Sequence, residues 1–81
     1  MKALRSTTAQ AVATILATAR EQAGMTQRDL ACRVKRPHSV IGMIESNKRQ
    51  VNMPEFIAIA EAIGADPAEL FRHVLRERSR R

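Results

Sequence analysis

The sequence predicts an all-α protein built from five short helices. Apolar residues recur at helical spacing in five segments, which open with capping residues or prolines, and no segment alternates as a strand would. The only aromatic residues are Phe56 and Phe71, so the core must be mainly aliphatic, which suits a small helical bundle better than a β-sandwich. A chain of 81 residues has room for one domain and not for a large enclosed active site.

The first helix is expected over about residues 8–23. Thr7 followed by Gln10 is a capping-box signal, and apolar residues then recur at helical spacing until Gly24, a residue favoured just past a helix end. Residues 1–6 are expected to form a flexible N-terminal arm.

Two short helices joined by a tight turn are expected over residues 26–46. Thr26 is a good N-cap for a helix that starts at Gln27, and Asp29 stands where its carboxylate can reach back to the cap. That helix should end before Pro37, because the residue before a proline is pushed out of the α region, and Pro37 suits the start of the next helix.

The two remaining helices carry the same signals. Asn52 with Glu55 forms a capping signature, and the helix that it opens should end at Gly64. Asp66 and Pro67 then open the last helix. The domain is expected to span residues 7–78, followed by a basic tail over 79–81.

Positive charge is concentrated at three places. Lys and Arg outnumber Asp and Glu by 14 to 8, for a net charge of +6 and a pI near 11.1. Two clusters, Lys35 with Arg36 and Lys48 with Arg49, flank the helix after Pro37, and five arginines load the last ten residues. Such clusters are expected of a nucleic-acid-binding protein, although the C-terminal arginines could equally serve solubility alone.

Other functions find little support. Cys32 has no second thiol with which to form a disulfide or a metal cluster, and two histidines and one cysteine at unrelated spacing predict no metal site. Cys32 and His38 are the only candidates for a nucleophile and its base, with no third group to orient them, so we expect no enzyme and no cofactor. Cys32 is instead expected to be a small, partly buried residue. No apolar run is long enough to cross a bilayer, and no secretory signal is evident, so a cytoplasmic location is expected.

The motifs resemble those of the Cro and phage-repressor (XRE) helix-turn-helix family. The resemblance runs without gaps from about Ile15 to Phe71. It rests on these motifs: Thr26-Gln27-x-x-Leu30-Ala31, Ser39-x-Ile41-x-x-Ile44-Glu45, Lys48-Arg49, and Ala60-x-x-Ile63-Gly64-Ala65-x-Pro67-x-x-Leu70-Phe71. It implies a compact five-helix phage-repressor-like bundle that places its third helix in the major groove of double-stranded DNA and binds as a homodimer.

The resemblance also implies roles for individual residues. Side chains and backbone at the exposed face of the third helix would face the bases: His38, Ser39, Gly42 and Met43. Phosphates would be contacted by Gln27, Arg28, Arg36, Lys48 and Arg49. Arg20 and Glu45 would form a structural ion pair between the first and third helices. The candidates for the dimer surface are Phe71, Val74 and Leu75, although these could equally face the core of the monomer.

The sequence departs from the family pattern at four positions. Lys35 and Asn47 stand where the family commonly has glycine, and lysine tolerates the left-handed conformation less well than asparagine, so a strained or lengthened turn is expected at Lys35. Gly42 and Met43 stand where the family commonly has polar side chains, and neither can form a bidentate hydrogen bond with a base. Direct readout of bases is therefore expected to be thin.

The sequence thus predicts a sequence-specific DNA-binding transcriptional regulator, with repression the expected mode and no small-molecule ligand evident. Phage repressors, restriction–modification controllers and antitoxins share this resemblance. Two alternatives stay open: a protein-interaction adaptor that uses the surface at Gly42 and Met43, and a basic protein that compacts DNA irrespective of sequence.

Overall fold

The computed structural model describes residues 7–80, which form five helices and no strand. The helices are α1 (Thr7–Gln22), α2 (Gln27–Val34), α3 (His38–Glu45), α4 (Met53–Ile63) and α5 (Pro67–Ser79). The predicted all-α class and the number of helices are confirmed. The expected flexible arm, residues 1–6, lies outside the described residues, as does Arg81.

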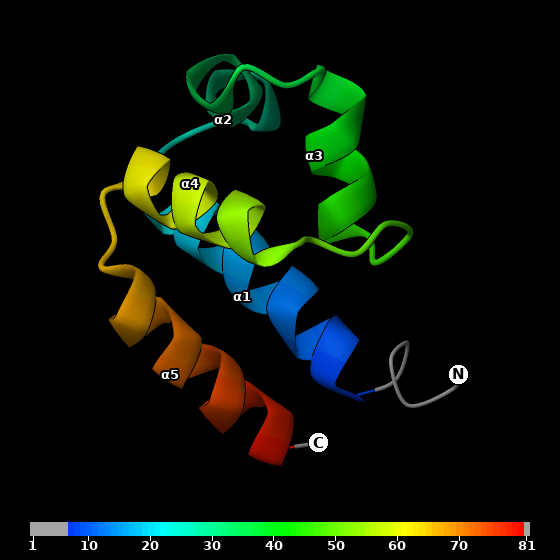
Figure 1. The fold of residues 1–81 in the computed structure, drawn as a ribbon, viewed down its shortest axis with the longest axis vertical. Coiled ribbons are helices and arrows are strands. Elements are labelled where there is room, and N and C mark those ends of the chain that lie inside the picture. Colours follow the sequence, from blue (N-terminus) through cyan, green and yellow to red (C-terminus); the bar gives the residue numbers. More distant parts are fainter. Residues whose placement is uncertain (1–6, 81) are drawn as a thin grey trace.

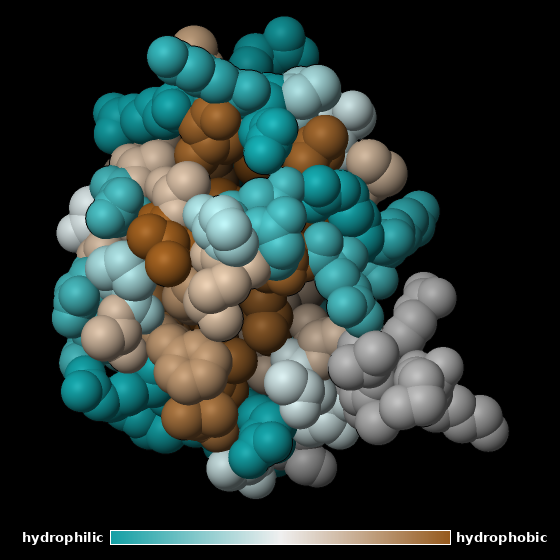
Figure 2. Space-filling view, in the orientation of Figure 1, coloured by the Kyte–Doolittle hydropathy of each residue, from teal (hydrophilic) through white to brown (hydrophobic). Residues whose placement is uncertain are grey.

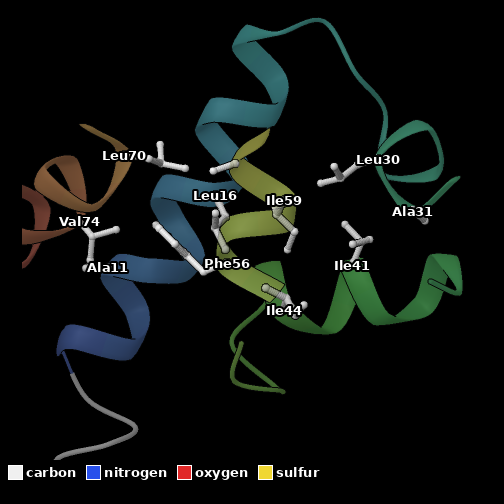
Figure 3. Close-up of a cluster of buried hydrophobic side chains, with 11 residues drawn as sticks. Ala11, Leu16, Leu30, Ala31, Ile41, Ile44, Phe56, Ile59, Leu70 and Val74 are labelled. Carbon is white, nitrogen blue, oxygen red and sulfur yellow. The ribbon is translucent and has the colours of Figure 1, made fainter. Parts of the chain in front are cut away.

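The helices surround one core. In Figure 1, α1 and α4 lie in the middle of the domain, α2 and α3 pack at one end, and α5 covers the other end. Figure 3 shows that side chains from all five helices point into the same cluster. The largest fully buried side chains are Leu16, Leu30, Ile41 and Val74. Because α2 and α3 bury their apolar residues in this shared core, two eight-residue helices that would be unstable alone are held in place.

The predicted caps of α2 and α4 are present. Thr26 Oγ1 accepts from the backbone N–H of Asp29, and Asp29 Oδ2 accepts in return from the N–H of Thr26, at 3.0 and 2.9 Å. This pairing, first through the backbone N–H of Thr26, holds the pKa of Asp29 below its usual value. Asn52 and Glu55 form the same reciprocal pair at the start of α4.

The expected signals at three helix starts differ from the structure, although α5 begins at Pro67 as predicted. Thr7 is the first residue of α1 rather than its cap, and the Gln10 amide donates to Thr14 Oγ1 at 3.3 Å instead of reaching back to Thr7. Pro37 is the residue before α3 rather than its first residue, because its ψ of 146° is extended. Asp66 precedes α5 without a side-chain capping bond, so Pro67 alone marks that start.

The first four helices end in the same way. A residue with a positive φ stands one or two positions past each end: Gly24, Lys35, Asn47 and Gly64. In each case the next backbone N–H bonds to the carbonyl five residues earlier, as from Arg36 to Ala31 at 3.0 Å. These are Schellman motifs, which satisfy carbonyl groups that a helix end leaves unpaired. The turn at Lys35 is therefore of the ordinary length, and the expected strain takes the form of a lysine at φ 58°.

Candidate nucleic-acid interface

Helix α3 exposes one face at the surface of the domain. Ile41 and Ile44 are buried, with 1% and 4% of their surfaces exposed, and they hold the inner face of the helix against the core. His38 and Ser39 are exposed in the first turn, and Met43 is 38% exposed one turn later. The four predicted base-facing positions therefore share the outer side of α3, with Gly42 half-buried among them.

The predicted ion pair between Arg20 and Glu45 is present and buried. Arg20 Nε donates to Glu45 Oε2 at 2.7 Å and Nη2 donates to Oε1 at 3.1 Å, while about a tenth of each side chain is exposed. Arg20 Nη1 also donates to the carbonyl oxygen of Met25. The Glu45 carboxylate raises the pKa of Arg20, first through the hydrogen bonds. Because these hydrogen bonds are short and charge-assisted, the network fixes the end of α3 against α1.

Gln27 joins the same network from the start of α2. Its Nε2 donates to Glu45 Oε1 at 2.9 Å. Its Oε1 lies beside Gly42, where an added Cβ would stand 3.6 Å away, an ordinary contact distance. Gln27 therefore holds the end of α3 from the side of α2. Crowding within the protein does not require a glycine at position 42.

The cations around α3 fall into two groups. Arg28 and Lys48 are exposed, and the side chain of neither forms a hydrogen bond or ion pair with any other residue in the range 7–80. Arg36 and Arg49 instead converge on Glu55, from the turn before α3 and from the loop after it. Arg28 and Lys48 are thus free to meet an anion, whereas Arg36 and Arg49 already have a carboxylate partner.

Glu55 is the residue whose role sequence reasoning missed. Arg49 Nη1 and Nη2 donate to its two oxygens at 3.1 and 2.7 Å, and the side chain is 8% exposed. Hydrogen bonds from Arg49, with a further one from the backbone of Asn52, lower the pKa of Glu55 from its ordinary value of 4.5. The capping signature located this carboxylate at the start of α4, but no spacing rule pairs it with arginines 6 and 19 residues earlier.

Two expectations are corrected. Cys32 is exposed rather than partly buried, because Leu30 and Ala31 occupy the inner face of α2 and Cys32 lies on the other side of that short helix. Val74 is 2% exposed and belongs to the core of the monomer, so it is not available for a dimer surface. Phe71 and Leu75 remain available, at 46% and 40% exposed.

The described residues contain no group of three or more potential metal ligands. Within the same part of the chain, no helix combines the length and the apolar character needed to cross a membrane.

The model of the helix-turn-helix family matches residues 16–70. The chain belongs to the XRE family of helix-turn-helix proteins. A solved XRE-family-like protein from Pseudomonas syringae pv. tomato is 33% identical over 93% of this chain and 92% of its own, with a TM-score of 0.83.

Other solved structures share the fold. A variant of the restriction–modification controller protein C.Esp1396I is 25% identical over 89% of this chain and 96% of its own, with a TM-score of 0.84. The clp gene regulator ClgR from Corynebacterium glutamicum is 20% identical over 85% of this chain and 90% of its own, with a TM-score of 0.80, which shows the fold alone. A comparison with curated protein sequences finds no match. Family and fold are those of DNA-binding transcription regulators, which are generally not enzymes.

Proposed function

We propose that this XRE-family protein is a sequence-specific transcriptional repressor that binds DNA as a homodimer and inserts α3 into the major groove. One observation carries the proposal: an exposed helix face, anchored rigidly from behind, stands between two pairs of cations. Sequence-specific recognition requires side chains held in a fixed register on the duplex, and backbone contacts supply that register. Such a regulator would act on the nucleoid, in the cytoplasm.

The exposed face of α3 supplies the proposed base contacts. His38 and Ser39 can both donate and accept hydrogen bonds at base edges, and Met43 can pack against a thymine methyl group. Gly42 would let the backbone approach the groove closely. Since only two of these four residues have polar side chains, part of the specificity would come from the shape and deformability of the DNA.

The proposed phosphate contacts differ in how they are made. Arg28 and Lys48 have no competing partner among residues 7–80 and would bind phosphates directly. Gln27 would offer its backbone N–H at the positive end of α2, because its side-chain amide is committed to Glu45. Arg36 and Arg49 would contact phosphates from within their ion pairs with a carboxylate.

Apolar surface on α4 and α5 supports the dimer. Brown and tan atoms gather on the face formed by these two helices (Figure 2). The large exposed apolar side chains there are Met53, Ile57, Phe71 and Leu75. A second copy meeting this face would bury them and would set two recognition helices at a fixed spacing, as two half-sites require. The controller protein C.Esp1396I, which has this fold, has been solved as a tetramer on its natural 35-base-pair operator.

The test is selection of preferred duplexes from a random-sequence pool, followed by titration of the best site and a scrambled duplex at two salt concentrations. A specific regulator should prefer the selected site by about three orders of magnitude or more at both salts. His38→Ala should lose about 1–3 kcal/mol of that preference, whereas His73→Ala, the other histidine and an exposed residue of α5, should not.

Two other results would replace the proposal. Equal binding of all sequences, unaffected by His38→Ala, would indicate a protein that compacts DNA. No DNA binding at all would direct attention to the surface at Gly42 and Met43 as a site for a protein partner.

A further inference from the structure

Glu55 holds two arginines that lie at opposite ends of the recognition helix. Arg49, in the loop after α3, donates to both carboxylate oxygens, and Arg36 Nη2, in the turn before α3, lies 3.8 Å from Oε2. The backbone N–H of Asn52 donates to Oε1 at 3.1 Å and fixes the carboxylate from behind. The three side chains form one cluster with a net charge of +1 instead of the +2 that two arginines alone would carry.

We infer that Glu55 is a specificity-determining residue, which limits the attraction of Arg36 and Arg49 for phosphates of any sequence. The inference rests on the proposed function, since it concerns how DNA is bound. Attraction to the phosphate backbone carries no sequence information and supplies nearly all non-specific affinity. A protein whose direct base contacts are few gains specificity when that general attraction is kept low.

The geometry indicates that the Glu55 carboxylate would compete with a DNA phosphate for Arg36 and Arg49. The Glu55 side chain is 8% exposed, so it is held in place, while 36% of the Arg49 side chain and 53% of the Arg36 side chain are exposed. A phosphate that approaches either arginine must share the guanidinium with a fixed carboxylate or displace it. A charge-assisted bidentate pair is the strongest arrangement that such a phosphate could meet, so the competition is substantial.

The decisive variant is Glu55→Gln, which keeps an oxygen for the Asn52 N–H but removes the negative charge. Its affinity for a labelled duplex of random sequence should rise about four- to eightfold at salt concentrations of about 0.2 to 0.1 M, the factor for one additional phosphate contact. The slope of log affinity against log salt should steepen by about 0.9. Affinity for the selected site should rise less, so the preference for it should fall.

The matched control is Glu69→Gln. Glu69 is also the third residue of its helix, it pairs with one arginine, Arg72, and neutralising it changes the net charge equally. It lies on α5, at the other end of the domain from α3 (Figure 1). A rise in Glu55→Gln that Glu69→Gln matches would be an effect of net charge and would overturn the inference.

One further variant tests the role of the charge directly, and another replaces Glu55→Gln if that variant does not fold. The double variant Glu55→Gln/Arg49→Gln restores the original net charge, and its affinity for random DNA and its salt slope should return to wild-type values. If Glu55→Gln does not fold, as judged by circular dichroism, Glu55→Asp decides. Its carboxylate is shorter by one methylene and should raise non-specific affinity in the same direction by a smaller factor.

The outcomes separate the two proposals. A wild-type protein that binds no DNA would refute the proposed function. A wild-type protein that binds its selected site, with random-sequence affinity and salt slope unchanged in the Glu55 variants, would refute only the role of Glu55.

Discussion

The buried pair of Arg20 and Glu45 should behave as a single unit, which a double-mutant cycle can measure. Arg20→Met leaves Glu45, whose side chain is 8% exposed, with only the hydrogen bond from Gln27 that the structure gives it. Glu45→Met leaves Arg20 with the Met25 carbonyl and with Glu21, 3.6 Å away and largely exposed. Removing one partner of a buried pair typically costs about 3–5 kcal/mol, because the other charge is left uncompensated.

The double variant should lose much less than the sum of the two single variants. With both charges gone, no unpaired buried ion is left at this site, and two methionines occupy much of the vacated volume. The remaining cost comes from the Met25 carbonyl and the Gln27 amide, which lose partners, and it should be about 1–2 kcal/mol. The coupling free energy, the sum of the two single losses minus the loss in the double variant, should therefore be about 4 kcal/mol or more. A domain of 81 residues has a free energy of unfolding of roughly 4–12 kcal/mol. Each single variant should therefore be only marginally stable.

Urea unfolding followed by circular dichroism at 222 nm gives the four free energies of unfolding, provided that the m-value stays constant. The exposed pair of Glu69 and Arg72 on α5 serves as the control, and its coupling should be below about 0.5 kcal/mol. Costs at Arg20 and Glu45 that add up to the cost of the double variant within about 0.5 kcal/mol would refute the idea that the pair acts as a unit.

Four other perturbations have defined expectations. Gly42→Ala should stabilise the fold by about 0.5–1 kcal/mol, because glycine is unfavourable inside a helix and the added carbon would lie 3.6 Å from its nearest neighbour. The same variant should bind the selected DNA site more weakly. A lower melting temperature would contradict the expected stabilisation. Lys35→Gly should stabilise by about 0.5–1 kcal/mol in thermal unfolding, because the left-handed conformation at φ 58° no longer costs energy, and an unchanged melting temperature would argue against strain there. The pKa of Glu55 is lowered in the folded state, so this carboxylate stabilises the fold fully above its ordinary pKa of 4.5, and that stabilisation is lost as the pH falls through the lowered pKa. Wild type should therefore lose more free energy of unfolding over this pH range than Glu55→Gln. Parallel pH profiles of the two proteins would exclude this contribution. Leu75→Arg should raise the dissociation constant of the dimer at least about tenfold in sedimentation experiments while the monomer stays folded, and an unchanged constant would place the dimer surface elsewhere.

The helices, and the caps of α2 and α4, were predictable because their signals are local. Asn52 and Glu55 lie three residues apart, and the hydrogen bonds of a capping box need nothing beyond that spacing. The pairing of Arg20 with Glu45, 25 residues apart, came from the resemblance to a family and not from any rule of spacing.

Contacts between distant residues without such guidance could not be predicted. Nothing local distinguishes Val74, which is buried, from Leu75, which is 40% exposed, because both lie on an apolar stripe that is wider than the surface available to cover it. The convergence of Arg36 and Arg49 on Glu55 likewise depends on where the shared core places the start of α4 relative to the two ends of α3. The positive charge of the two arginines was evident from the sequence, but its partial neutralisation was not.

The residues with positive φ on either side of the recognition helix are Lys35 and Asn47, while glycine occupies the two equivalent positions elsewhere in the fold. A residue with a Cβ has fewer accessible backbone conformations than glycine, so the joints at both ends of α3 are stiff. Less orientational freedom then remains for α3 to lose when it enters a groove, which lowers the entropic cost of binding. Glycine at these two positions would make the free protein more stable, but α3 would lose more orientational freedom, and so more entropy, when it binds DNA.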